Sequence, residues 1–142
     1  MIIPDLSVLL YAIDATSPRH DIARTWLKTT LNDGSDDVGV PLVVHLGFLR
    51  LSTSPRLFPN PLPVDKACEW MENLWKNPLV VPVNPGRGHN GILKHLLLAL
   101  GTGGSLVTDA HLATLALEYD AVLATGDRDF QRFPGLKVHL LF

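Results

Sequence analysis

The first twelve residues read MIIPDLSVLLYA, an apolar segment and a carboxylate followed by a second apolar segment. Residues 1–4 are typical of a short buried strand, which ends at Asp5. Leu6–Ala12 is apolar on nearly all sides and is predicted to form a buried helix. Because a strand followed at once by a helix is the building unit of α/β folds, this segment indicates the fold class.

The same alternation continues along the rest of the chain and predicts an α/β fold in three layers, with a mostly parallel sheet between helices. Ser54–Pro63 contains four prolines and is predicted to be a loop. Further strands are predicted at Val38–Val40, Leu79–Val83, Ala121–Ala124 and Lys137–Leu140, and further helices at residues 17–31, Leu42–Leu51, Val64–Trp75, Ile92–Leu100 and 108–119, with Ser17-Pro18 and Thr108 as helix starts.

The composition is that of one globular domain, and we expect residues 1–142 to form it. Hydrophobic residues make up 46% of the chain, which is enough for a sizeable core and excludes a disordered segment. The formal net charge of −2 excludes nucleic-acid binding by bulk positive charge alone. The single cysteine, Cys68, cannot form an internal disulfide, so a reducing compartment is expected.

The sequence predicts no membrane contact. The longest run without Asp, Glu, Lys or Arg is residues 95–108, which is shorter than the roughly 20 apolar residues of a spanning helix and is interrupted by glycines. The first five residues include an acid and no basic segment, unlike a signal peptide. A cytoplasmic protein is therefore expected.

Carboxylates follow two of the predicted strands and are expected to meet at one edge of the sheet. Asp5 follows the first strand, and Asp127 and Asp129 follow the strand at Ala121–Ala124. In open parallel sheets, ligands bind beyond the carboxyl ends of the strands, so these side chains should converge there. Asp109, at the start of a predicted helix, is placed to join them.

Several carboxylates in one crevice repel one another and stay ionised only beside a cation. Hard cations such as Mg²⁺ or Mn²⁺ prefer oxygen ligands, so this edge is a candidate metal site for phosphoryl chemistry. Each acid taken alone has a structural alternative. Asp109 is also typical of a helix N-terminus, and Asp127-Arg128-Asp129 after Gly126 is also typical of a turn.

Three segments in order resemble the motifs of PIN-domain ribonucleases, and in length the chain resembles the VapC-type toxins of bacterial toxin–antitoxin pairs. They are Ile3–Ala12 (IPDLSVLLYA), Thr108–Ala113 (TDAHLA) and Thr125–Phe130 (TGDRDF). The resemblance covers essentially the whole chain. It implies a Mg²⁺- or Mn²⁺-dependent endoribonuclease with an RNA substrate, neutralised by a cognate antitoxin protein and forming a homodimer.

The resemblance also implies roles for individual residues. By position, Asp5, Asp109 and Asp127 match metal-binding catalytic acids, and Asp129 matches a further, less uniform metal ligand. Ser7 and Thr125 match positions at which the family carries small polar residues near the site.

One position departs from the family pattern. Most members carry a glutamate in a second motif that aligns with Leu46–Arg50, and here the matching residue is Gly47. Water can take the place of a missing Mg²⁺ ligand. Alternatively, the chain is a catalytically weakened PIN-like module that binds RNA or a partner. Glu69 and Glu72, on the next predicted helix, are candidates to replace the missing glutamate, but both are expected to be exposed to solvent.

Arginines and histidines are secondary candidates. Arg50 and Arg128 are placed to bind RNA phosphates. For Arg128, an ion pair with the neighbouring acids is an equally good interpretation. His111 points about 200° away from Asp109 on an ideal helix, so a structural role is expected for it. A packed, hydrogen-bonded role is also expected for His45. A phosphatase or receiver-type domain is a further alternative, and the absence of a lysine near the acids in the sequence argues against it.

Overall fold

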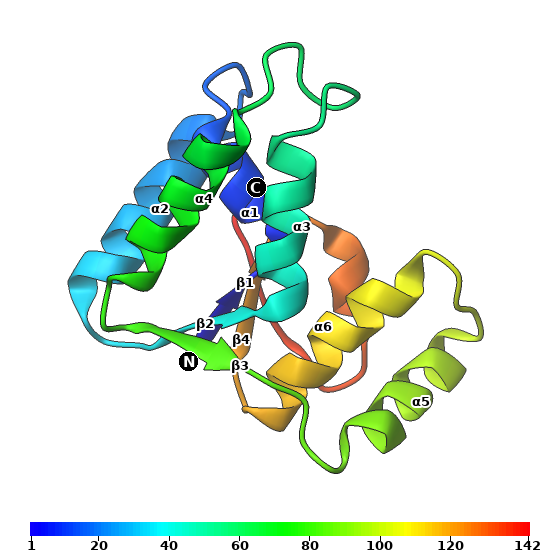
Figure 1. Ribbon diagram of the computed structural model, residues 1–142. Coiled ribbons are helices and arrows are strands. Elements are labelled where there is room, and N and C mark those ends of the chain that lie inside the picture. Colours follow the sequence, from blue (N-terminus) through cyan, green and yellow to red (C-terminus); the bar gives the residue numbers. More distant parts are fainter.

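The computed structural model describes residues 1–142 and contains five strands and six α-helices (Figure 1). Every strand and helix expected from the sequence is present, and Ser54–Pro63 is a loop as predicted. In chain order the elements are β1 (Ile2–Pro4), α1 (Leu6–Ile13), α2 (His20–Asp33), β2 (Val38–Pro41), α3 (Leu42–Ser52), α4 (Val64–Trp75), β3 (Val80–Val83), α5 (His89–Leu100), α6 (Leu106–Glu118), β4 (Val122–Thr125), the 3₁₀ helix η1 (Arg128–Arg132) and β5 (Lys137–Leu140).

The strands form one sheet in the order β3-β2-β1-β4-β5, and all four pairings are parallel. The sequence predicted a mostly parallel sheet, and the observed one is parallel throughout. Strand β1 lies in the centre, where Ile2 is in register with Val38 of β2 and Val122 of β4. The carboxyl ends of β1 and β4, which carry the acids, are therefore neighbours.

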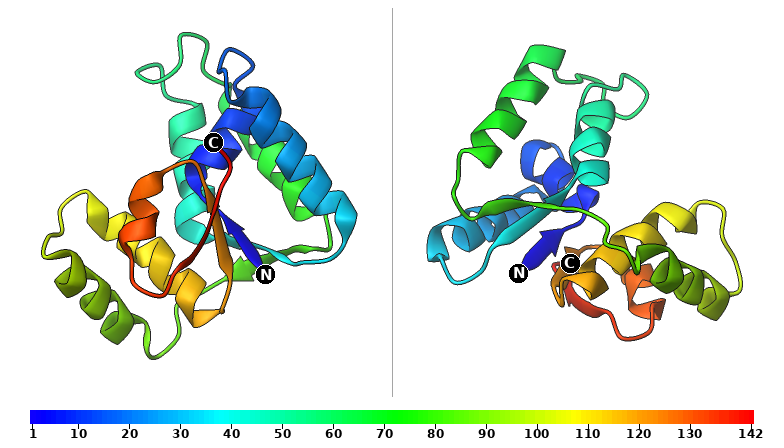
Figure 2. Two further views of the ribbon diagram at one scale, coloured as in Figure 1. Left: turned by 180° about the vertical axis from the view of Figure 1, so that it is seen from behind. Right: turned by 60° about the horizontal axis from the view of Figure 1, so that its bottom comes forward.

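Helices cover both faces of the sheet and give the three layers expected from the sequence. Figures 1 and 2 show α1 to α4 on one side and α5 and α6 on the other. Helix α1 packs on α2 and α3, and α5 packs on α6 as a helical hairpin. The chain also ends beside α1, as the view from behind in Figure 2 shows.

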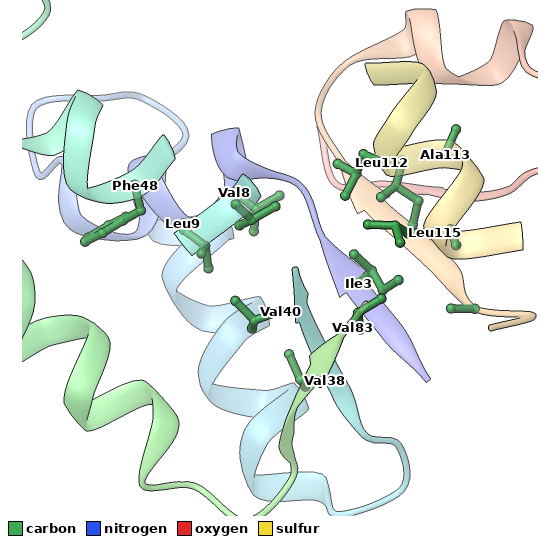
Figure 3. Close-up of a cluster of buried hydrophobic side chains, with 14 of the residues drawn as sticks. Ile3, Val8, Leu9, Val38, Val40, Phe48, Val83, Leu112, Ala113 and Leu115 are labelled. Carbon is green, nitrogen blue, oxygen red and sulfur yellow. The ribbon is translucent and has the colours of Figure 1, made fainter. Parts of the chain in front are cut away.

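The core forms on both faces of the sheet. Ile3 of β1 and Leu123 of β4 are fully buried, together with Val38 and Val40 of β2. Figure 3 shows these β1 and β2 residues between Phe48 of α3 and the side chains of α6. Burial on both faces is the reason that the strands read as continuous apolar runs rather than as alternating patterns.

Three helix starts differ from the sequence prediction, and one of them is that of α5, which begins at His89 rather than at Ile92. Helix α6 begins at Leu106 after Ser105, so Thr108 is not its cap. The amides of Leu106 and Val107 donate to the carbonyls of Gly103 and Gly104, and the glycine turn thereby starts the helix earlier. Helix α2 begins at His20, because the Ser17-Pro18 pair forms a turn that precedes the helix.

Helix α5 ends where the sequence predicts. Gly101 follows its last residue with a φ of 72°, a left-handed conformation that favours glycine. None of the helices combines the length and apolarity that a bilayer-spanning segment requires.

Candidate functional site

Asp5 lies at the carboxyl end of the central strand, where two hydroxyl groups orient it. Its backbone amide donates to the carbonyl of Ala124 at 2.8 Å, which joins β1 to β4. Its Oδ2 accepts hydrogen bonds from Ser7 Oγ at 2.8 Å and Thr125 Oγ1 at 2.9 Å. The two polar residues that the sequence singled out therefore both contact Asp5.

Burial in the sheet edge raises the pKa of Asp5 above its ordinary value. Hydrogen bonds from Ser7 and Thr125 act in the opposite direction, and the nearby negative charge of Asp127 adds to the increase. The carboxylate is thus placed where its negative charge is costly unless a cation is near.

The turn after β4 presents two further carboxylates. The buried Thr125 hydroxyl oxygen accepts a hydrogen bond from the Asp127 amide at 3.0 Å, while it donates to Asp5. Asp127 Oδ1 then accepts from the Asp129 amide at 2.8 Å and caps η1. The turn that the sequence offered as an alternative is present, and both of its carboxylates are exposed beside Asp5.

Asp109 reaches the same edge from the first turn of α6. Burial, together with the negative charges of Asp5, Asp127 and Asp129, raises the pKa of Asp109 to about 6. This mutual influence places four carboxylates from three separate segments in one electrostatic cluster, which we call the acidic edge. It corresponds to the convergence expected from the sequence.

The donors of the acidic edge fit a hard cation through a small number of direct contacts. All of them are carboxylate oxygens, the ligand type that Mg²⁺ and Mn²⁺ prefer. No three His, Cys, Asp or Glu side chains are close enough together to chelate one ion. An open arrangement of this kind suits Mg²⁺, which usually keeps several waters and binds through one or two carboxylates.

Gly47 is buried on α3, next to the residue that follows Asp5. A Cβ added at this position would lie 2.6 Å from Leu6 Cδ2. The place of the missing glutamate is therefore taken by an apolar side chain. Glu69 does not compensate, because it is exposed and pairs with Lys66 at 3.3 Å, and Glu72 is exposed as well.

The two arginines predicted to bind RNA are both exposed. Arg128 makes no ion pair with the acids on either side of it, so the paired arrangement considered from the sequence is absent. Arg50 lies near the end of α3 and makes no hydrogen bond or ion pair with the acidic edge. The structure brings Arg128 to the acidic edge and gives Arg50 no contact with it.

His45 and His111, for which a structural role was expected, both make hydrogen-bond contacts between helices. His45 Nδ1 accepts a hydrogen bond from Trp75 Nε1 at 3.0 Å, between α3 and α4. His111 contacts His89 of α5 at 2.8 Å, and burial lowers its pKa from the ordinary value. His89 also contacts Glu118 at 2.7 Å.

Some residues near these contacts were not singled out from the sequence. The partners His89 and Glu118 lie on different helices, and no periodicity connects them. Arg19 lies beside Gly126 in the structure, although more than a hundred residues separate them in the sequence. Only the folded chain brings such pairs together.

The structure offers no lysine for a receiver-type site. Lys137 is the lysine nearest in sequence to the acids that follow β4, and it begins β5 and pairs with Asp120 at 2.7 Å. Asp120 precedes β4, so this pair lies at the opposite end of the sheet from the acidic edge.

Solved structures of VapBC proteins share the fold. VapBC-1 from nontypeable Haemophilus influenzae matches with a TM-score of 0.71 at 18% identity, over 99% of this chain and 98% of that one. VapBC2 from Rickettsia felis, bound to a DNA fragment from their promoter, matches with a TM-score of 0.70 at 16% identity, again over 99% and 98%.

Sequence comparison gives nearer relatives. Ribonuclease VapC37 of Mycobacterium tuberculosis (strain ATCC 25618 / H37Rv) is 44% identical over 137 residues, which are 96% of this chain and 94% of the relative. Ribonuclease VapC33 of the CDC 1551 / Oshkosh strain is 39% identical, over 96% of this chain and 95% of that one. The model of the PIN domain matches residues 2–136, and the chain therefore belongs to the PIN domain family.

Proposed function

We propose that this protein is a metal-dependent endoribonuclease and the toxin of a type II toxin–antitoxin system, acting in the cytoplasm. Residues 1–142 act as a single catalytic domain. One observation carries the proposal: β1 and β4 pair side by side, and the Thr125 hydroxyl at the end of β4 both donates to Asp5 and accepts from the Asp127 amide, so acids from two strands share the acidic edge. The relatives named ribonucleases, at up to 44% identity, support the same activity.

Asp5, Asp109 and Asp127, with Asp129 as a further ligand, would hold Mg²⁺ or Mn²⁺. One or two of these carboxylates would contact an ion directly, and the others would act through its bound waters. When bound, such an ion activates a water and stabilises the charge that develops on the phosphoryl oxygens. The residues fit this group because all of their donors are carboxylate oxygens, and because the negative charges of Asp5, Asp127 and Asp129 act on Asp109.

The chain's own side chains hold the acids in position for this role. Ser7 and Thr125 both donate to Oδ2 of Asp5 and so fix the orientation of that carboxylate. Thr125 also receives the amide of Asp127, which couples the turn after β4 to the end of β1. We assign Ser7 and Thr125 to positioning, and Asp5, Asp109 and Asp127 to catalysis.

The partners of the proposed enzyme are RNA, an antitoxin protein and a second copy of the chain. Arg128, exposed and unpaired between two acids, is placed to bind an RNA phosphate, and we assign Arg50 the same role. The VapC resemblance supports the antitoxin. Exposed apolar side chains on α3, Leu42 and Leu46, support a homodimer, since such residues are common at interfaces.

Cleavage of total cellular RNA by the purified chain tests the proposal. The reaction is run in Mn²⁺, in Mg²⁺ and in EDTA, with Asp5→Asn and Asp109→Asn alongside. We expect discrete fragments that need the metal, and a loss of at least about 100-fold in rate in both variants, since each removes a charged group of the reacting site. Full activity in both purified variants would contradict the assignment.

A second candidate is a PIN-like module that binds RNA or a partner without efficient cleavage. The observation in its favour is that Leu6 occupies the side of α3 where Gly47 replaces the expected acid. Titration calorimetry with Mn²⁺ separates the two candidates. Binding that is lost in Asp5→Asn supports the enzyme, and no binding by the wild type supports the module.

A further inference from the structure

We propose that Arg19 is a positioning residue that binds the phosphodiester backbone of the RNA beside the acidic edge. It is held ready for this role by the rings of Tyr11 and Phe142. The inference rests on the proposed ribonuclease function and assigns it a substrate contact.

Two aromatic rings fix the Arg19 side chain. The guanidinium carbon lies 5.0 Å from the centre of the Phe142 ring and 5.5 Å from that of Tyr11. The two rings contact each other edge to face, with centres 5.4 Å apart. Arg19 Nη1 also donates a long hydrogen bond of 3.4 Å to the Tyr11 hydroxyl. An arginine held by cation–π contacts keeps most of its N–H donors free for another acceptor.

No Asp or Glu side chain forms an ion pair with this cation. Arg19 is exposed and takes part in no ion pair. The guanidinium lies over the rings of Phe142 and Tyr11 instead, so its charge remains available for an anion.

Gly126 places this cation next to the acidic edge. The glycine lies between Thr125, which contacts Asp5, and Asp127. A Cβ at position 126 would overlap the Phe142 ring, and it would lie 3.7 Å from Arg19 Nη1. The aromatic ring therefore rests directly on the turn that carries Asp127, with the guanidinium beside it.

A phosphate is the ligand that this arrangement fits. RNA carries one negative charge for each nucleotide. When it approaches the acidic edge, it is repelled by the carboxylates whose negative charge a metal ion does not balance. A guanidinium at the rim offers a planar fork that matches phosphate oxygens. Since the side chain is already ordered, little conformational entropy is lost when the phosphate binds.

The experiment measures RNA binding and cleavage separately. Binding of a fluorescent single-stranded RNA oligonucleotide is followed by anisotropy over a range of KCl concentrations. An Asp109→Asn background prevents cleavage in this arm. Steady-state cleavage is measured in otherwise wild-type protein, with Mn²⁺. The variants are Arg19→Ala, Arg19→Lys and Phe142→Leu. The matched control is Arg24→Ala, an exposed arginine on α2, the helix that begins directly after Arg19.

We expect Arg19→Ala to raise Kd and KM about tenfold while kcat changes little, because one charge-assisted contact to a phosphate is lost. The slope of log Kd against log [KCl] should decrease by about 0.7, the contribution of one phosphate on a single strand. Arg19→Lys should recover part of the loss, and Phe142→Leu should raise Kd less than Arg19→Ala. The control should leave Kd, KM and the slope unchanged.

The outcomes separate this inference from the proposed function. Cleavage by the wild type, with Kd and salt slope unchanged in Arg19→Ala, would overturn the role of Arg19 and leave the ribonuclease intact. No cleavage by the wild type would overturn the ribonuclease, while the salt slope still decides whether Arg19 contacts RNA. A purely structural role would lower thermal stability in Arg19→Ala without changing the salt slope, and this result would also overturn the inference.

Discussion

Asp109 bears an electrostatic cost that comes from burial and from the other carboxylates of the acidic edge. Its pKa is about 6 in the folded chain, against an ordinary value of 3.8. The folded state therefore holds the proton of this carboxyl more tightly than the unfolded state. As the pH rises from 3.8 through 6, the free energy of unfolding falls, and the full penalty is present above pH 6.

We predict that Asp109→Asn stabilises the metal-free protein at pH 7.5 by an amount on the order of 2 kcal/mol. The neutral amide removes both the buried charge and its repulsion with the other acids. Urea unfolding in EDTA at pH 7.5 and pH 4.5 checks this, and the advantage over the wild type should shrink at the lower pH. A variant that is less stable than the wild type at pH 7.5 would show that Asp109 does not carry this cost.

At the scale of single residues, the sequence predicted the acids of the acidic edge but not Arg19, the arginine near them. Asp5 and Asp127 each follow an apolar strand, so their position at the sheet edge is predictable from local pattern. Arg19 and Phe142 belong to no local pattern, and their contact depends on how the end of the chain crosses α1. Gly47 was identified from the resemblance, but only the structure shows that Leu6 lies against it.

At the scale of elements, the α5–α6 hairpin that carries Asp109 is held by a buried polar chain. His89 is 6% exposed and contacts both Glu118 and His111 of α6. Glu118 also accepts the amide of Gly86 at 2.9 Å, before α5 begins. These bonds tie the start of α5 to the middle and the last residue of α6, in addition to the apolar contacts between the helices.

His89→Ala should therefore lower the free energy of unfolding by about 2 to 3 kcal/mol, because it leaves the half-buried Glu118 carboxylate without its histidine partner. Urea unfolding at pH 7.5 measures the loss. His95→Ala is the matched control, an exposed histidine on the same helix, and its effect should stay within about 0.5 kcal/mol. Equal effects in the two variants would mean that the buried polar chain contributes nothing to stability.

The elements themselves were largely predictable, and their starts less so. Apolar periodicity is a property of a whole helix, so α2 and α6 were both identified. Their first turns depend on local hydrogen bonds that the periodicity does not contain. Gly103 and Gly104 start α6 before Thr108, and Ser17 and Pro18 form a turn before α2.

At the scale of the whole molecule, the strand order determines where the acids meet. A parallel sheet with helices on both faces was predicted, and so was the convergence of the acids at its carboxyl edge. The order β3-β2-β1-β4-β5 was not predicted, because apolar strands of similar length do not encode their neighbours in the sequence. It is this order that places β1 beside β4 and completes the acidic edge. The catalytic roles of the acids remain a prediction.

A cation that binds the acidic edge should stabilise the entire fold, since it removes the repulsion described for Asp109. At a Mn²⁺ concentration of 100 times Kd, the gain is about 2.7 kcal/mol, or roughly 5 to 10 °C in Tm for a chain of this size. Thermal unfolding in Mn²⁺ and in EDTA measures it. Asp5→Asn, which lacks a proposed ligand, should show a clearly smaller increase, and an undiminished increase would place the ion elsewhere.

The hydrogen bond from Thr125 to Asp5 joins residues that lie 120 positions apart in the sequence. A ribosome making this chain produces Asp5 well before the partner strand and its acids, because more than a hundred residues separate them. A nascent chain therefore has no acidic edge until synthesis has passed Asp129. If the protein is the toxin that we propose, truncated translation products that stop before β4 are harmless to the cell. The topology of the sheet would then delay the harmful activity until β4 and the acids that follow it have been made.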